Sequence, residues 1–230
     1  MSVPEILSEI NDYASALETA ALWHNSKESI DRVSHKQKIN NGEDYIYEFY
    51  CYVRVLVDLM YHYKVVFKAG TGKNAMNFPQ APCPKKGRPY FMVKDKETGV
   101  DLFQVCAGTQ IKTLFPPMQA APDISFQKPN ASDTPDHTEV FAIFDAKFNR
   151  GKTKSKVSQG QLSEVTSMIA NLQLNTPVVN NIRFKRLAGL TKNCLLTNGK
   201  AHFDNLAYHQ HHNLLEIESF TVKEVFTIVG

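Results

Sequence analysis

The chain has 230 residues, of which 43% are hydrophobic and 21% are charged, and its formal net charge is +3 at pH 7. This composition is typical of a globular protein with a hydrophobic core, and no apolar run reaches the roughly 20 residues that span a bilayer. The small net charge does not by itself indicate a nucleic-acid partner, so such a partner must be argued from where the charges lie.

The N-terminal sequence and the cysteines favour a cytoplasmic protein. The first residues, MSVPEILSEIND, are acidic and lack the basic start and apolar stretch of a secretory signal. The four cysteines form no CxxC pair, and we expect reduced thiols rather than a zinc site or a disulfide framework. They are Cys51, Cys83, Cys106 and Cys194.

The first helix is predicted over residues 2 to 23. Ser2 and Glu5 have the spacing of a capping box. Residues 24 to 42 are polar and indicate a connection that can include a helical turn. The first helix, over residues 2 to 23, has one apolar face, which is expected to pack on the core or on a second copy of the chain. This face carries Ile6, Ile10, Tyr13, Leu17 and Ala21 at helical spacing.

A second helix is predicted from about Glu43 to Tyr63. Placing its residues at about 100° intervals gives an almost continuous apolar surface. Glu48 falls on an apolar arc, where an ionised carboxylate costs several kcal/mol unless a cation pairs with it. The helix is therefore expected to be mostly buried, with one narrow polar face that carries Asp44, Tyr47, Arg54 and Asp58.

Most of the remaining chain is predicted to form strands, because runs rich in β-branched and aromatic residues are bounded by Gly, Pro and Asp. The sequence KDKETGVD predicts a hairpin turn between the strands over residues 89 to 94 and 101 to 107. A helix is expected over residues 158 to 174, and the tail from 201 to 230 fits either a strand pair or a helix plus a strand. The predicted strands are residues 64 to 69, 89 to 94, 101 to 107, 122 to 126, 139 to 148 and 193 to 198.

The order of these elements indicates the fold class. A helix is followed by several strands, then by a helix and a further strand. This order predicts an α/β protein in which a central mixed β-sheet is flanked by helices around one core.

Two aspartates are predicted to meet at one end of a β-hairpin. Asp145 and Lys147 are two residues apart on a strand, so their side chains project from the same face. If this strand pairs antiparallel with the preceding one, Asp123 lies beside both residues. Asp136 also follows a proline, but the intervening strand would place it roughly 30 Å from Asp145. We therefore choose Asp123.

Two carboxylates at one place repel each other and require a cation between them. Oxygen ligands select a hard divalent ion such as Mg²⁺, and a lysine beside that ion can hold a charged water or a phosphate oxygen. This combination suits metal-assisted hydrolysis of a phosphodiester. The alternative is a surface ion pair between Asp145 and Lys147, which would leave Asp123 and Glu48 unexplained.

The motif Pro122-Asp123, followed after 22 residues by Asp145-Ala146-Lys147, resembles the PD-(D/E)xK nuclease superfamily. The resemblance covers roughly residues 43 to 198. In that family the acids lie on a β-hairpin at the edge of the sheet, and a glutamate often comes from the preceding helix. Glu48 matches that glutamate. The resemblance implies a restriction-endonuclease-like core over residues 41 to 230, preceded by an N-terminal helical segment over residues 1 to 40.

The family's chemistry would be carried by the matching positions. Glu48, Asp123 and Asp145, with the Ala146 carbonyl, would bind one or two Mg²⁺ ions, for which Mn²⁺ can substitute. Lys147 would orient the attacking water or help to deprotonate it. Members of the family generally leave a 5′-phosphate and a 3′-hydroxyl.

Two of these assignments have structural alternatives. The helix after the second acid often supplies another polar residue in this family, and Gln161 lies on its inward face. However, Ser158 and Gln161 also have the spacing of a capping box. Glu48 could instead pair with a buried arginine or lysine.

Basic residues follow the second acid directly, and a basic loop beside a metal site suits contact with a phosphate backbone. A solvated loop is the alternative for both basic clusters. The first cluster contains Arg150, Lys152, Lys154 and Lys156, and the second contains Arg183, Lys185 and Arg186.

The sequence thus predicts a magnesium-dependent endonuclease of the restriction type. So short a chain is expected to act on double-stranded DNA as a homodimer, or as the cutting subunit of a larger system. The alternative is a non-catalytic subunit that keeps the nuclease fold to bind nucleic acid or a protein. RNA is a further candidate substrate, although no aromatic RNA-binding motif is visible.

Overall fold

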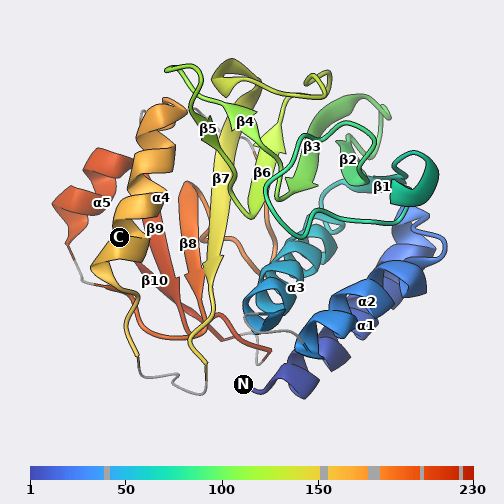
Figure 1. Ribbon diagram of the computed structural model, residues 1–230, viewed down its shortest axis with the longest axis horizontal. Helices are drawn as coiled ribbons and strands as arrows, with labels where there is room; N and C mark the ends of the chain where they lie inside the picture. Colours follow the sequence, from blue (N-terminus) through green and yellow to red (C-terminus); the bar gives the residue numbers. More distant parts are fainter. Residues whose placement is uncertain (39–41, 151–154, 176–181, 203–204, 223–224) are drawn as a thin grey trace.

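The computed structural model describes residues 1–38, 42–150, 155–175, 182–202, 205–222 and 225–230. A mixed eight-stranded sheet lies at the centre, with helices on both faces (Figure 1). The order of strands across the sheet is β1-β2-β3-β6-β7-β8-β9-β10, and β4 and β5 form a separate pair. The predicted α/β class with a central mixed sheet is confirmed.

The helices divide between the two faces of the sheet. One face carries α1 (Val3–Ala21), α2 (Ser26–Ser34) and α3 (Gly42–Leu59), and the other carries α4 (Gln159–Asn171) and α5 (Leu206–His212) (Figure 1). Three short 3₁₀ turns complete the helical elements of the described residues. They are η1 (His35–Lys38), η2 (Gly72–Asn74) and η3 (His137–Glu139).

Neighbouring strands from β1 to β7 run antiparallel, whereas β8 is parallel to β7 and β9 is parallel to β8. The last strand, β10, is antiparallel to β9. A parallel pair needs a long crossover, and α4 lies in the connection between β7 and β8. The strands are β1 (Lys64–Lys68), β2 (Tyr90–Lys94), β3 (Asp101–Ala107), β4 (Ile111–Lys112), β5 (Gln119–Ala120), β6 (Ile124–Gln127), β7 (Val140–Lys147), β8 (Asn193–Thr197), β9 (Leu214–Glu218) and β10 (Thr227–Val229).

The buried apolar residues form two clusters rather than the expected single core, because the sheet separates them. The larger cluster joins α1 and α3 to one face, and the smaller one joins α4 to the other. Ile6, Ile10 and Leu17 of α1 are fully buried in the larger cluster, and the predicted capping box of Ser2 and Glu5 is present. The N-terminal helix therefore packs on the core of its own chain.

The prediction for the polar face of α3 was wrong. Tyr47, Arg54 and Asp58 are all buried. The Arg54 guanidinium donates to the Thr221 carbonyl at 2.8 Å, and the Asp58 carboxylate accepts the backbone N–H of Lys185 at 2.7 Å. These partners come from segments far along the chain, which cover a helix face that would otherwise be exposed.

The boundaries of the other predicted elements differ less from those in the structure. Helix α3 ends at Leu59 rather than near residue 63, and the connection over residues 24 to 42 contains a two-turn helix, α2. The tail contains a strand pair, β9 and β10, which is one of the two alternatives, with α5 before it. Across the described residues, no helix has both the length and the hydropathy needed to cross a bilayer.

Candidate active site

The β6–β7 hairpin brings the two predicted acids together. Ile124 lies opposite Phe144, so the next position of the antiparallel register places Asp123 opposite Asp145. The Asp123 carboxylate accepts the backbone N–H of Ala146 at 2.7 Å, which fixes it to the end of β7. The hairpin lies in the middle of the sheet and not at its edge, since β6 and β7 both have strand neighbours on either side.

Asp136, the competing acid, has a local structural role. It is the N-cap of η3, before the start of β7, and its side chain accepts the backbone N–H of Thr138 at 2.8 Å. Asp145 lies near the other end of the same strand. The structure therefore brings Asp123, and not Asp136, to Asp145.

Lys147 is the cation that contacts this acid cluster in the described part of the chain. Its Nζ atom lies 2.7 Å from Asp145 Oδ2 and 3.4 Å from Glu164 Oε2. The Asp145 side chain is only 4% exposed and that of Lys147 is 19% exposed. A carboxylate this deeply buried is costly without a partner, so the lysine contact stabilises the fold and is also a feature of the site.

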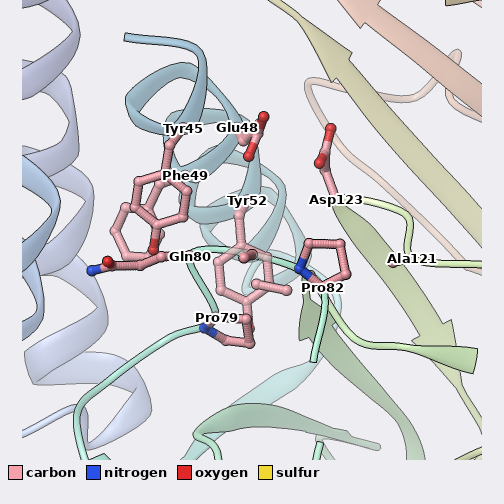
Figure 2. A pocket seen from close by; sticks show the side chains of 12 residues that line it. Tyr45, Glu48, Phe49, Tyr52, Pro79, Gln80, Pro82, Ala121 and Asp123 are labelled. Atoms are coloured by element: carbon pink, nitrogen blue, oxygen red, sulfur yellow. The ribbon is translucent and has the colours of Figure 1, made fainter. Parts of the chain in front are cut away.

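Glu48 completes the cluster from α3. Glu48 and Asp123 both line a pocket of about 290 Å³, and in Figure 2 their carboxylates lie at the same end of it. The buried cation on the same helix, Arg54, is directed elsewhere, to Thr221 and the ring of Phe220. The alternative in which Glu48 pairs with a buried arginine or lysine therefore finds no support from Arg54, and the lysine whose charge lowers the pKa of Glu48 is Lys147 of the site itself.

Burial is the main cause that raises the pKa values of the three acids. Burial, and then the neighbouring Asp145, raises the pKa of Glu48 to about 7. Burial, Asp145 and Glu48 raise the pKa of Asp123 well above its ordinary value, and burial raises that of Asp145 although Lys147 opposes the shift. Burial alone would lower the pKa of Lys147, but Asp145 and Asp123 raise it above its ordinary value. The cluster therefore favours the binding of cations or protons.

The donor set suits a hard divalent ion. Three carboxylates and the main-chain carbonyl of Ala146 offer only oxygen, which is the ligand chemistry of Mg²⁺ and Mn²⁺. Asp145 Oδ2 is buried and accepts no aligned hydrogen bond despite its charge contact with Lys147. Among the described residues, no three His, Cys, Asp or Glu side chains are already spaced as a metal-binding group. The candidate ligands therefore fit such an ion by the type of their donor atoms.

Gln161 does not have the predicted place in the site. Its side-chain oxygen accepts the backbone N–H of Ser158 at 2.9 Å and thereby completes the capping box of α4. Glu164, three residues further along the helix, contacts Lys147 instead. Sequence reasoning missed Glu164, although its i+3 spacing from Gln161 places it on a neighbouring part of the same helix surface.

The predicted basic residues lie in different settings. Arg150 pairs with Asp44 at 3.0 Å and with Glu43 at 3.6 Å, both at the start of α3. Lys156 is exposed, and Lys152 and Lys154 lie outside the described residues. The second cluster, Arg183, Lys185 and Arg186, is exposed, and its backbone is held by Tyr63 and Asp58.

The raised pKa of Glu48 predicts a pH-dependent stability. Between its ordinary value of 4.5 and about 7, the folded protein keeps a proton that the unfolded chain has lost. Protonated Glu48 therefore contributes to the free energy of unfolding, on the order of 2 kcal/mol after allowance for partial exposure. The contribution is fully present below the pKa of Glu48 in the unfolded chain and is lost as the pH rises through about 7. Without divalent ions, the melting temperature should therefore fall across this window.

The matched test compares Glu48→Gln with Glu97→Gln, since Glu97 is exposed. Thermal unfolding in a chelating buffer should show a shallower pH dependence for Glu48→Gln, because only Asp123 and Asp145 still titrate in this cluster. Glu97→Gln should behave as the wild type does. An unchanged profile for Glu48→Gln would contradict the assigned electrostatics.

The chemical capacity of the site follows from its charges. A largely buried cluster of acids can bind a divalent cation in place of protons, and a protonated lysine beside it can hold a phosphate oxygen or a water molecule. The elements that carry these groups are α3, the residue before β6, the end of β7 and α4.

No family model, curated protein or solved structure matches the chain.

Proposed function

We propose that the protein is a metal-dependent deoxyribonuclease that hydrolyses DNA phosphodiester bonds, as an endonuclease of the restriction type. The observation that supports it most is the convergence of Asp123, Asp145 and Lys147 at one end of the β6–β7 hairpin, with Glu48 beside them. An isolated surface ion pair would not need two further acids beside it, and burial, followed by the charge of Asp145, raises the pKa values of both Glu48 and Asp123.

The order of elements also supports this proposal. A helix with a glutamate, a hairpin with two aspartates, a second helix and a parallel strand follow one another as α3, β6–β7, α4 and β8. This order is the basis for proposing a restriction-endonuclease-like core within the observed sheet. The N-terminal helices α1 and α2 and the outer strands would then be additions to it.

The chain's own residues would divide the work. When bound, the divalent ion supplies Lewis-acid stabilisation of the charge that develops on the phosphate and on the leaving oxygen. Glu48, Asp123, Asp145 and the Ala146 carbonyl would hold that ion. Lys147 has a raised pKa and stays protonated beside Asp145, which favours orienting the water or the phosphate over acting as a base. Glu164 would help to position Lys147.

The hydrolysis itself has a simple balance. The oxygen of water attacks phosphorus and the water loses a proton to solvent, the bond from phosphorus to the 3′ oxygen breaks, and the 3′ oxygen takes up a proton from solvent. The products would be a 5′-phosphate and a 3′-hydroxyl. The reaction requires positioned charges to stabilise the attacking and leaving oxygens, and it requires no oxidant or reductant.

Contact with the DNA backbone is proposed for Arg150 and Lys156, with Lys152 and Lys154 in the same segment. Arg150 stands three residues after Lys147 and must exchange its contacts with Glu43 and Asp44 for a phosphate. Replacing it by alanine should weaken binding to all DNA sequences alike and lower the slope of log affinity against log salt by about 1. Fluorescence anisotropy across a salt series measures both quantities.

The matched control for this prediction is Lys27→Ala, because Lys27 is an exposed lysine of α2. It should leave the affinity and the salt slope unchanged. If Arg150→Ala and Lys27→Ala bind DNA with the same slope, Arg150 makes no phosphate contact.

The function is tested by incubating the protein with supercoiled plasmid, single-stranded DNA and RNA in Mg²⁺, in Mn²⁺ and in a chelator. Metal-dependent nicking or linearisation that leaves 5′-phosphates is the expected result. Cleavage of RNA alone would show that the substrate is RNA and not DNA. Salt-sensitive DNA binding without cleavage of any substrate would favour the non-catalytic subunit. Analysis of mass in solution, with and without duplex DNA, tests the proposed homodimer.

A further inference from the structure

The pocket beside the acids has a wall that the hydrolysis does not use. Glu48 and Asp123 form one end of it, and most of the remaining lining is apolar or aromatic (Figure 2). The volume of about 290 Å³ lies at the lower limit for small-ligand sites. The walls include Tyr45, Phe49, Tyr52, Pro79, Pro82 and Ala121.

The aromatic wall is held in place. Tyr45, Phe49 and Tyr52 recur at i, i+4 and i+7 on α3, so they share one face of the helix. The Tyr52 hydroxyl donates to the Val105 carbonyl at 2.9 Å, and the ring of Phe49 packs edge-on against Phe78 with centroids 5.4 Å apart. Phe49 and Tyr52 are themselves almost fully buried, so Tyr45 presents most of the accessible ring surface of this wall, on a fixed backing of packed rings.

The opposite wall is tied to the end of the strand pair that carries Asp123. Gly108 has a φ of 51°, and a Cβ atom there would lie 3.1 Å from Cβ of Pro79. This glycine lets the segment with Pro79 and Pro82 approach β3 closely. Gly108 also donates its N–H to the Asp123 carbonyl at 3.0 Å. The pocket and the acids thus belong to one rigid unit.

The charge of the pocket limits its occupant. Two carboxylates at one end repel a free anion there unless a cation intervenes, and the flat apolar walls suit a planar, uncharged ring. Stacking on aromatic side chains is the usual way to hold an unstacked base, and it tolerates different bases. A duplex is too wide for this volume, whereas a single base is not.

We infer that this pocket holds one unstacked nucleobase of the substrate, on the nucleotide next to the phosphate bound at the acids. The inference rests on the proposed nuclease function and adds a substrate preference to it. The protein therefore favours nucleic acid with an unpaired or extruded base at the cleavage position. The base would come either from a single strand or from a duplex by flipping.

The test uses a short single-stranded oligonucleotide that contains the fluorescent base aminopurine, in Ca²⁺ as a divalent ion with oxygen ligands. Stacking on the pocket rings should quench its fluorescence. Tyr45→Ala removes a partly exposed wall residue, and Ala121→Leu fills the pocket. Tyr208→Ala is the matched control, because Tyr208 is a partly buried tyrosine on α5, on the other face of the sheet.

Wild type and Tyr208→Ala should quench the base, whereas Tyr45→Ala and Ala121→Leu should bind the oligonucleotide about tenfold more weakly and lose the quenching. Absence of quenching by the wild type, or equal quenching by all four proteins, overturns the inference. If a fully paired duplex competes as strongly as the single strand in the wild type, and this competition weakens in Tyr45→Ala and Ala121→Leu, the bound base comes from a duplex by flipping.

Cleavage in Mg²⁺ is measured on the same proteins, so the two proposals can fail separately. Metal-dependent cleavage without quenching would leave the nuclease proposal standing and overturn the pocket inference. Quenching that is lost in Tyr45→Ala, with no cleavage in any protein, would support the pocket as a base-binding site and count against hydrolysis.

Discussion

Replacing Asp145 by asparagine should lower the rate of DNA cleavage by about 10³-fold, equivalent to about 4 kcal/mol of transition-state stabilisation. The asparagine keeps the shape of the side chain but removes the charge that would hold the divalent ion. Asp145 is also the acid whose carboxylate contacts Lys147, at 2.7 Å. A single substitution therefore affects both the metal and the lysine. Initial rates of plasmid linearisation in Mg²⁺ provide the measurement.

The chain offers a matched control for this variant in Asp136→Asn. Asp136 follows a proline, as Asp123 does, but it caps η3 and lies before the other end of β7. Asp136→Asn should cleave at the wild-type rate and lose at most about 1 kcal/mol of stability through the weaker cap. Asp145→Asn should stay folded, since the amide keeps the shape of a carboxylate whose burial is costly and Lys147 keeps its contact with Glu164. Wild-type cleavage by Asp145→Asn would contradict the assignment.

Replacing Lys147 by alanine should have two effects, one on cleavage and one on folding. Cleavage should fall by about 10²- to 10³-fold, because a positioned cation at the phosphate is lost. Stability should fall by about 1–3 kcal/mol, because Asp145 would remain buried without its partner. Chemical denaturation without divalent ions measures the second effect, and adding Mn²⁺ should reduce it by supplying another cation.

The control for Lys147 is Lys94→Ala, which removes a strand lysine paired with Asp101 near the surface. That pair is more exposed, so its loss should cost less than about 1 kcal/mol and should not change cleavage. Lys147→Arg should recover the stability while recovering cleavage only in part, because a guanidinium has a different shape from an ammonium. If Lys147→Ala were as stable and active as Lys94→Ala, Lys147 would have neither role.

Much of the acid cluster could be predicted from sequence because its geometry is local. The two-residue period of a strand places Asp145 and Lys147 on one face, and an antiparallel hairpin brings Asp123 to them. The place of Glu48 follows from the helical period of an almost wholly apolar helix. The structure brings all four residues together.

The errors arose where long-range contacts decide the outcome. Arg54 and Asp58 were expected to face solvent, but they bind the backbone of residues 167 and 127 positions further along the chain. Ser158 and Gln161 fit both a capping box and a site residue, and only the fold shows that the cap is formed and that Glu164 meets Lys147.

The pocket beside the acids could not be predicted from sequence patterns. Its walls come from α3, from the segment around Pro79 and from the end of β3, which are brought together by tertiary contacts. The positive φ of Gly108 permits the close approach, but an isolated glycine after a strand is an ordinary turn signal.

The most direct measurement is a calorimetric titration of the protein with Mn²⁺, because metal binding does not depend on finding the right DNA sequence or partner subunit. The wild type should bind one or two ions per chain, Asp136→Asn should match it, and Asp145→Asn should lose most of the binding. Absence of binding by the wild type, or equal binding by wild type and Asp145→Asn, would contradict the assignment of the acid cluster as the metal site of a nuclease.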